Sequence, residues 1–427
     1  MFNNYMAHIR CMGAAAALTV SAMALGAQPA PMAKPEQVGF TADGLQKITE
    51  VVKQHIDAGD IPGAITLVAR NGRIAYLDAQ GVTDAQTKTP MKTDMVFWVA
   101  SMTKPFVGAT VMMMVEAGKV KLDDPVSKFV PEFKVPQQVR VLKPGSPDPA
   151  AARRGGGPPD PNAPKPEFDL VPATREMTVK DLLTHTSGIQ GIGVANPTAP
   201  AFGDSLTAYA AGWGAVPRDF QPGSRWAYSN AAAFDVLARI VEVTSGKPYD
   251  QFMKERVWQP LGITDASFGP NPALQARTLP LGGANAANPC VAGKLPCGSA
   301  GMWVSAEGYW RFAQMLTNKG QFNGKRLLKA STVDQMVANH VAGDLYPGSG
   351  GLSGKGVVMG LSMLTVTDPA AAGTALPKGS FGWDGVGSRR FWAVPQENMV
   401  IVMLLPGGMS AVVHRDIEKT VMAALKK

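Results

Sequence analysis

Hydrophobic residues recur at two different spacings in the first part of the chain. Over residues 42–58 they fall every three or four positions, which is the period of an amphipathic helix. Two short apolar runs, at 64–69 and 74–77, then flank Asn71-Gly72. This dipeptide tolerates positive φ angles and favours a tight hairpin. The pattern therefore predicts a helix followed by the first two strands of an antiparallel sheet.

Helical and strand-like segments follow one another in a recognisable order along the rest of the chain. An apolar block at 96–100 leads into helical spacing over 101–117, and residues 179–316 are mainly helical with many turns. Strand-like segments and a last amphipathic helix follow; they cover residues 363–366, 390–394, 399–404 and 412–425. Strands near both chain ends can complete one sheet around an inserted helical region. We therefore expect an α/β body, an all-α lobe and a cleft between them.

Residues 134–174 interrupt this pattern with runs of Pro and Gly that cannot sustain a helix or a central strand. We expect an irregular surface insertion here, either a loop near a site or a decoration. The remaining pattern predicts an α/β domain built from residues 35–118 and 300–427. A mainly helical domain is expected from residues 119–299.

The N-terminus has the pattern of a targeting segment. Arg10 precedes an apolar run at 12–25, and Ala22-Met23-Ala24 supplies the small residues of a cleavage site. This predicts a signal peptide over residues 1–27 and a periplasmic or secreted protein; the alternative is a disordered cytosolic tail. No later stretch reaches the length of a membrane span, so we expect none in the mature protein.

Composition narrows the function classes. The chain has 427 residues, of which 45% are hydrophobic, so a large core can be buried. The formal net charge is +8, but the densest basic spots, Arg153-Arg154 and Arg389-Arg390, are only pairs. Nucleic-acid binding usually needs a basic stripe, so we do not expect a nucleic-acid partner.

Cys290 and Cys297 lie on one short loop rich in Gly and Pro. In an exported protein, two such thiols favour a local disulfide; the alternative is two free thiols. A zinc site is not expected because no histidine lies near them in the sequence.

Ser101-Met102-Thr103-Lys104 is the first candidate for chemistry. If a helix begins at Ser101, its hydroxyl and the Lys104 ammonium lie on one face, one turn apart. The helix N-terminus would offer N–H groups to an anion forming there. A buried lysine can lose its proton near neutral pH and activate a serine. By itself, however, the motif is also typical of an ordinary helix cap.

Tyr228-Ser229-Asn230 is the second candidate, at a turn before a helical segment at 231–243. A phenol close to a serine and a lysine can relay a proton to a leaving group. Asn230 can orient Lys104 and donate a hydrogen bond to a substrate carbonyl. Alone, such a tyrosine is more often a packed ring at a turn. Histidine offers no better nucleophile partner, since the G-x-S-x-G motif is absent.

Together these motifs resemble the serine β-lactamase-related family, which includes class C β-lactamases, D-Ala-D-Ala carboxypeptidases, D-aminopeptidases and family VIII carboxylesterases. Other landmarks of the family occur in the same order: Leu122-Asp123-Asp124-Pro125-Val126, Asp181-Leu182-Leu183-Thr184-His185-Thr186-Ser187-Gly188, Phe220-Gln221-Pro222-Gly223-Ser224 and Ser299-Ala300-Gly301-Met302. The resemblance implies an α+β fold of the β-lactamase/transpeptidase type, an antiparallel sheet flanked by helices with an inserted all-α lobe.

The resemblance also implies the roles of the site residues. Ser101 would be the nucleophile, Lys104 the base or the cation that orients the base, and Tyr228 the general acid and base. The N–H groups of Ser101 and Val386 would form the oxyanion hole, and no metal or organic cofactor is implied.

The third family motif departs from the β-lactamase pattern. Where β-lactamases and peptidases of the family carry Lys-Thr-Gly or His-x-Gly, this chain has Trp383-Asp384-Gly385. Gly385 lets the backbone approach a substrate closely. Trp383 cannot bind a substrate carboxylate as a cation would. Arg389-Arg390 could restore an anion site, although Asp384 would repel the anion.

The sequence therefore favours a carboxylesterase that acts on small neutral esters through an acyl-enzyme on Ser101, with weak β-lactamase activity as a side reaction. One alternative is a β-lactamase, a D-Ala-D-Ala carboxypeptidase or a D-aminopeptidase. Another is a non-catalytic binding protein of the same fold, against which the intact Ser101, Lys104, Tyr228 and Asn230 argue.

Overall fold

The structure is a computed structural model that describes residues 31–134, 136–147, 164–189, 200–281, 283–342, 345–346, 354–407 and 411–426. The predicted signal peptide over residues 1–27 lies outside the described residues.

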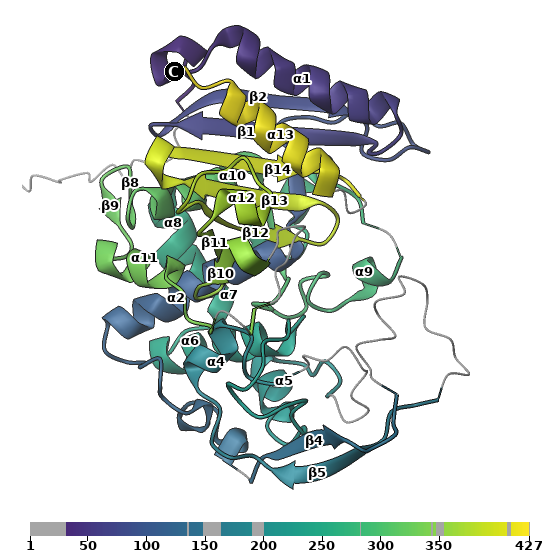
Figure 1. The fold of residues 1–427 in the computed structure, drawn as a ribbon, viewed down its shortest axis with the longest axis vertical. Coiled ribbons are helices and arrows are strands. Elements are labelled where there is room, and N and C mark those ends of the chain that lie inside the picture. The colour runs from purple at the N-terminus through teal and green to yellow at the C-terminus, as the bar shows by residue number, and fades with distance from the viewer. Residues whose placement is uncertain are drawn as a thin grey trace, which may run out of the picture.

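A seven-stranded antiparallel sheet occupies one end of the molecule, with strand order β10-β11-β12-β13-β14-β1-β2 (Figure 1). Its strands are β1 (Gly63–Arg70), β2 (Arg73–Gly81), β10 (Val357–Met359), β11 (Leu364–Val366), β12 (Phe381–Gly385), β13 (Arg389–Val394) and β14 (Met399–Leu404). Strand β1 pairs with β14, so that Ile65 lies opposite Leu404. The expected closure of one sheet by strands from both chain ends is confirmed.

Local sequence explains the first hairpin. Asn71 and Gly72 have φ angles of 56° and 71°, as a tight turn between twisted strands requires. Helices α1 (Ala42–Asp57) and α13 (Ala411–Ala423) pack against each other on one face of the sheet, and α10 (Ala306–Thr317) packs against β1, β13 and β14. All residues of β13 and β14 are buried. Strand β14 consists of hydrophobic residues alone, whereas β13 begins with Arg389 and Arg390, which are buried with hydrogen-bond partners.

The remaining helices are α2 (Lys104–Glu116), α4 (Val179–Leu183), α5 (Leu206–Gly212), α6 (Ala232–Ser245), α7 (Tyr249–Met253), α8 (Gln259–Leu261), α9 (Gly283–Ala287), α11 (Ala330–Val337) and α12 (Pro369–Ala372). Of these, α4, α5 and α6 lie below the large sheet in Figure 1. Helix α2 is hydrophobic all round, and every residue from Lys104 to Met114 is buried. This burial places the lysine of the Ser-x-x-Lys motif inside the protein.

A small second sheet connects the two candidate regions. It contains β3 (Val96–Trp98), β7 (Met302–Ser305) and β6 (Ser267–Phe268), in the order β3-β7-β6. Because β3 pairs with β7, the segment that leads to Ser101 lies beside the segment that follows Ser299. One connected hydrophobic core extends from the large sheet through α2 to α6. The domain boundaries at residues 118 and 300 therefore stay a prediction.

The prediction that residues 134–174 are irregular is wrong at both ends of this segment. There, β4 (Gln138–Leu142) and β5 (Phe168–Pro172) form a two-stranded ribbon at the end of the molecule away from the large sheet (Figure 1). A buried ion pair between Arg140 and Asp219 anchors this ribbon. The ribbon was not predicted because the alternating apolar residues of β4 and β5 are short runs next to long stretches of Pro and Gly. Another short hairpin joins β8 (Gln321–Phe322) to β9 (Lys325–Arg326).

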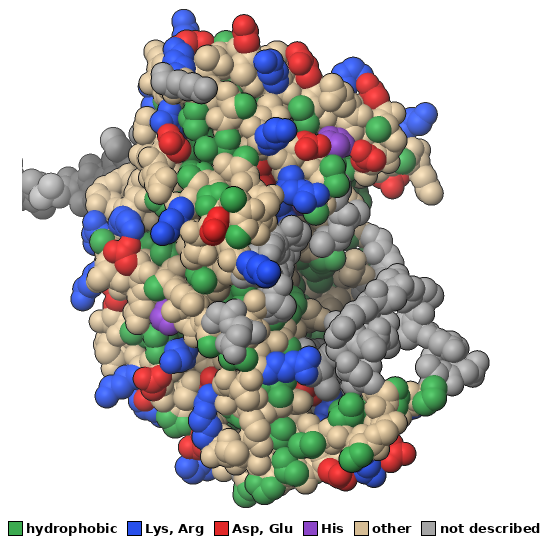
Figure 2. Space-filling model, in the orientation of Figure 1, with side chains coloured by type: hydrophobic (Ala, Val, Ile, Leu, Met, Phe, Trp, Pro, Cys, Tyr) green, Lys and Arg blue, Asp and Glu red, His purple; other side chains and the backbone are tan. Residues whose placement is uncertain are grey.

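On the face seen in Figure 2, Lys and Arg side chains are scattered among Asp and Glu side chains and form no continuous stripe. In the part of the chain that the structure describes, no helix is both long enough and apolar enough to cross a membrane.

Candidate active site

Ser101 lies in a 3-10 turn, η2 (Ala100–Thr103), between β3 and α2. The expectation that the helix begins at Ser101 is wrong, because α2 begins at Lys104. Ala100 is buried and has a φ angle of 48°, a left-handed conformation that is unfavourable for a residue with a Cβ. Backbone strain of about 1–3 kcal/mol is typical of functional sites. Here it turns the Ser101 side chain out of the core at the start of α2.

Lys104 is fully buried and lies beside Ser101. Its Nζ donates to three oxygens: Ser101 Oγ at 3.2 Å, the Asn230 carbonyl at 3.0 Å and the Ser299 carbonyl at 2.8 Å. Three acceptors match the three hydrogens of an ammonium group. The geometry therefore holds a desolvated positive charge against the Ser101 hydroxyl.

The phenol of Tyr228 completes the contacts of Ser101. Its hydroxyl donates to Ser101 Oγ at 2.8 Å, and Lys104 Nζ lies 4.9 Å from the centre of its ring. His185 supports the same segment, since its Nδ1 accepts a hydrogen bond from the Ser229 N–H at 3.1 Å. Burial, together with the Lys104 charge, holds the pKa of His185 well below its usual range. His185 is therefore a neutral acceptor that fixes the Tyr228 loop.

Asn230 lies at the same site, but its contact with Lys104 differs from the prediction. The main-chain oxygen of Asn230 accepts from Lys104, so the backbone rather than the side-chain amide orients the lysine. The exposed side chain lines the cleft in front of Ser101.

The cleft beside Ser101 has a volume of about 540 Å³, in the range of small-molecule sites. Most of its described lining is apolar; it includes Trp98, Ala100, Phe202, Val291, Leu364, Trp383 and Val386. The segment from Trp383 to Val386 forms one wall, as predicted for the third motif. Gly385 is required for a different reason than expected, because a Cβ there would lie 2.4 Å from the Val99 carbonyl oxygen. Glycine thus allows β12 to lie directly beside η2.

Two arginines follow this wall, and neither lines the cleft. Arg390 is buried and donates to both carboxylate oxygens of Asp384, at 2.6 and 2.9 Å, and to Glu418 at 3.1 Å. Arg389 is also buried and donates to the Val386 carbonyl at 2.6 Å. Asp384 does line the cleft, but its charge is compensated by Arg390. Lys104 is thus the one buried cation that contacts Ser101 among the described residues.

Comparison with known proteins agrees with this geometry. The sequence profile of the family described as Beta-lactamase matches residues 48–421. This chain belongs to the β-lactamase family. Members of this family are serine hydrolases with a common fold, and the α+β expectation is confirmed.

Two relatives of this β-lactamase-family protein, together with one solved structure, cover most of its length. Protein Rv1367c of Mycobacterium tuberculosis is 30% identical over 377 residues, which cover 83% of this chain and 88% of that protein. Esterase EstB of Burkholderia gladioli is 29% identical over 394 residues, 84% of this chain and 89% of its own. The structure of EstCE1, described as a hydrolase with promiscuous acyltransferase activity, has a TM-score of 0.69. It is 24% identical and covers 89% of this chain and 99% of its own.

Two residues of this β-lactamase-family site were not predicted to act there. Asp235 on α6 is fully buried and accepts hydrogen bonds from the N–H and the hydroxyl of Ser299. In the sequence, Ser299 stands out only as part of a family landmark, yet its carbonyl accepts a hydrogen bond from Lys104. A signal for Asp235 was available: an acidic residue on a helix that is otherwise apolar must find buried partners.

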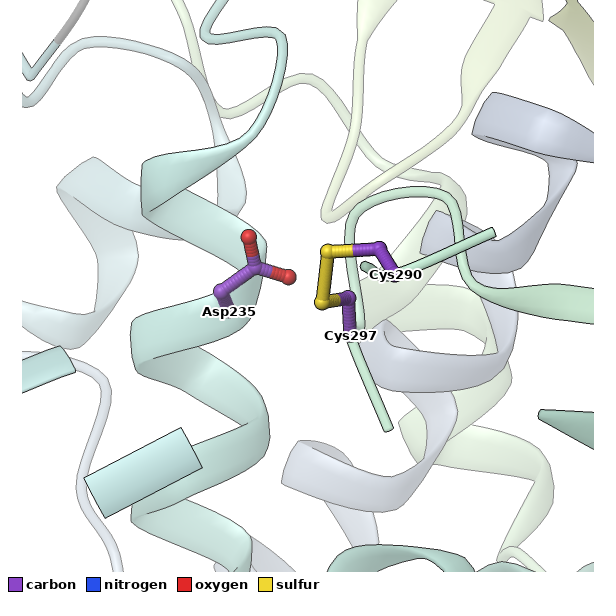
Figure 3. Close-up of side chains that lie close together, drawn as sticks. All are labelled: Asp235, Cys290 and Cys297. Atoms are coloured by element: carbon purple, nitrogen blue, oxygen red, sulfur yellow. A yellow bond between two sulfur atoms is a disulfide. The ribbon is translucent and has the colours of Figure 1, made fainter. Parts of the chain in front are cut away.

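Figure 3 shows Asp235 pointing toward the disulfide between Cys290 and Cys297. The sulfurs of both cysteines and one Asp235 oxygen lie within 4.8 Å of one another. While the disulfide is closed, these cysteines offer no thiolate to a metal ion. Cys290 and Val291 line the cleft, so the disulfide ties down one of its walls.

We expect the double variant Cys290→Ser/Cys297→Ser to unfold with a free energy about 2 kcal/mol lower, because the disulfide closes a short loop. KM for an ester substrate should rise, since this loop borders the cleft. Denaturant unfolding with and without dithiothreitol measures the effect. The reductant should lower the stability of the wild type and leave the double variant unchanged. Equal sensitivity of both proteins would contradict the prediction.

Proposed function

We propose that this protein is a serine carboxylesterase that hydrolyses small neutral esters through an acyl-enzyme on Ser101. The observation that carries the proposal is the hydroxyl of Ser101 between Lys104 Nζ and the Tyr228 hydroxyl, at the base of an apolar cleft. The similarity to Esterase EstB supports the same reaction class.

Ser101 Oγ would attack the ester carbonyl while its proton passes to the Tyr228–Lys104 pair, the two groups within hydrogen-bond distance. For this step the pair must hold one proton fewer than a phenol plus an ammonium, and the proton from Ser101 fills that vacancy. The pair shares the proton, so neither residue alone is assigned the base. The N–H groups of Ser101 and Val386 would stabilise the oxyanion. The pair then protonates the departing alcohol. A water molecule next attacks the acyl carbon and gives its proton to the same pair; the bond to Ser101 Oγ breaks, and the pair returns the proton to Ser101.

The chemistry of the cleft supports neutral esters over substrates that carry a carboxylate. By the resemblance of the third motif, Trp383 would stand where β-lactamases of the family place a cation. Its ring is stacked against that of His185, with 6.0 Å between the ring centres. Asp384 already binds Arg390. A substrate carboxylate would therefore enter a cleft whose described lining includes an acidic residue and no Lys or Arg.

The test compares two matched p-nitrophenyl esters, the butyrate and the hydrogen succinate, which differ in a terminal carboxylate. We expect kcat/KM for the butyrate to be at least about tenfold higher, because a charge-assisted hydrogen bond is worth about 1.5–3 kcal/mol and none is available here. A chromogenic cephalosporin should be a poorer substrate still. If the succinate and the cephalosporin are preferred, the β-lactamase or peptidase alternative replaces the esterase.

We further propose that the protein is exported to the periplasm or secreted. The sequence of residues 1–27 supports a signal peptide, and a disulfide between Cys290 and Cys297 is favoured in an oxidising compartment. Cell fractionation followed by N-terminal sequencing tests this; full-length protein in the cytosol would contradict it.

A further inference from the structure

Asp235 is a buried acid that the proposed mechanism does not use. It lies on α6 with no exposed surface, and its carboxylate is hydrogen-bonded to Ser299, which belongs to another segment of the chain. One carboxylate oxygen accepts from the Ser299 N–H at 2.9 Å and the other from the Ser299 hydroxyl at 3.1 Å. Burying a carboxylate is unfavourable unless its charge is compensated. Its retention beside the active site therefore calls for a function.

Ser299 connects Asp235 to Lys104. The N–H and the hydroxyl of Ser299 are held by the carboxylate, while its carbonyl accepts from Lys104 Nζ at 2.8 Å. This is the shortest of the three hydrogen bonds of Lys104. A displacement of Ser299 would therefore remove a main acceptor of the lysine that contacts Ser101.

Charge supports the same connection. Within the described chain, no carboxylate lies within ion-pair distance of Lys104, although the lysine is fully buried. The charge of Lys104 nevertheless acts on Asp235 and favours its ionised form. The negative charge of an ionised Asp235 and the positive charge of Lys104 therefore attract each other across the buried site.

We propose that Asp235 is a positioning residue for the reaction: through Ser299 it holds Lys104 beside Ser101, and it supplies the negative charge that balances the buried ammonium. This inference rests on the proposed acyl-enzyme function.

The proposal makes the activation of Ser101 depend on the ionisation of Asp235. Burial raises the pKa of Asp235 to about 6, and the hydrogen bonds from Ser299 and the charge of Lys104 oppose that rise. Above pH 6 the carboxylate carries its charge and accepts both bonds. Below pH 6 the proton removes the charge and one acceptor position, so Ser101 should become less reactive.

Other titratable groups around Asp235 are neutral or engaged elsewhere in the described structure. Tyr209 on α5 and Tyr249 on α7 face it as phenols whose pKa is raised, chiefly by burial and further by the Asp235 charge. Asp181 on α4 is bound by Arg175. On α6 itself, Arg239 pairs with Glu242. The disulfide beside the carboxylate does not titrate. Lys104 is thus the charged partner that the pH dependence involves.

The experiment measures the rate at which a fluorophosphonate labels Ser101 between pH 4.5 and 8.5, in the wild type and in Asp235→Asn. Asparagine can keep both contacts with Ser299 but carries no charge. We expect labelling of the wild type to fall as the pH drops through about 6. In Asp235→Asn the labelling rate at pH 7.5 should be at least about tenfold lower than in the wild type. The fall in rate near pH 6 should be absent from this variant. Asp219→Asn removes a different buried, paired carboxylate and should keep the wild-type profile.

A second variant keeps the proposal testable if Asp235→Asn does not fold. Ser299→Ala removes the hydrogen bond from the Ser299 hydroxyl, which lowers the pKa of Asp235. The labelling rate of this variant should therefore begin to fall at a higher pH than in the wild type. The inference is overturned if Asp235→Asn has the labelling rate and pH dependence of the wild type. It is also overturned if the labelling rate of Ser299→Ala falls at the same pH as that of the wild type. No labelling of the wild type at any pH would instead reject the acyl-enzyme function itself, so the two failures are distinguishable.

Discussion

The variant Ser101→Ala is expected to lose at least about 10⁴-fold in kcat/KM for p-nitrophenyl butyrate and to retain its fold. Alanine removes the atom that both Lys104 and Tyr228 contact, and no other described hydroxyl is bonded to this pair of groups. Lys104 keeps two carbonyl acceptors, from Asn230 and Ser299, so the buried ammonium remains solvated by the protein. Steady-state kinetics and circular dichroism measure the two expectations.

Ser127→Ala is a suitable control for this variant. Ser127 donates to Glu176 on the surface, and its loss should change neither the kinetics nor labelling by a fluorophosphonate. Intact-mass analysis should show one adduct on the wild type and none on Ser101→Ala. Turnover by Ser101→Ala at a rate near that of the wild type would reject Ser101 as the nucleophile, and with it the choice of reaction class.

Short-range patterns predicted the parts of the fold that depend on local sequence. Asn71-Gly72 identified the β1–β2 hairpin because only a few residue types adopt its φ angles without strain. The helical spacing before it identified α1. The small sheet could not be predicted in the same way, because β3 and β7 pair with each other although most of the helical region lies between them in the sequence. Such a long-range partner leaves no trace in local periodicity.

Which arginine compensates Asp384 in the third motif depends on how β12 pairs with β13, and the sequence pattern alone did not supply that pairing. Asp384 and Arg390 lie directly opposite each other on β12 and β13, because they are equally far from the turn between the strands. This pairing answers whether Arg389 or Arg390 could bind an anion in the cleft. Arg390 compensates Asp384, and Arg389 holds the turn at Val386. The sequence alone allowed either arginine to face the substrate.

The contact between Asp235 and Ser299 could not be predicted for a related reason. The two residues are far apart in sequence, and each has an ordinary local explanation, as a helix residue and as a loop serine. Only the packing of α6 against the loop after the disulfide brings them together. The candidate nucleophile could be named from sequence, whereas the buried charge that accompanies it required the structure.

The variant Lys104→Met is expected to lower kcat for the same ester by at least about 10³-fold, since it removes a positive charge and a proton-handling group from Ser101. Methionine matches the length and apolar stem of lysine, so the loss is mainly that of the ammonium. Lys119→Met is the matched control, because Lys119 also donates to a carbonyl, that of Thr244, but lies on the surface. The control should retain wild-type kinetics.

Lys104→Met should also change how stability depends on pH, and the direction follows from Asp235. Its folded-state pKa of about 6 lies above the ordinary value of 3.8, so the folded state binds this proton more tightly. The resulting stabilisation is complete below pH 3.8 and is lost as the pH rises through 6. Without the charge of Lys104, the folded-state pKa rises further, and the free energy of unfolding should fall more steeply between pH 5 and 8 than in the wild type. Urea unfolding at pH 5 and pH 8 measures this difference. If the free energy of unfolding changes with pH to the same extent in Lys104→Met, Lys119→Met and the wild type, Asp235 and Lys104 are not coupled.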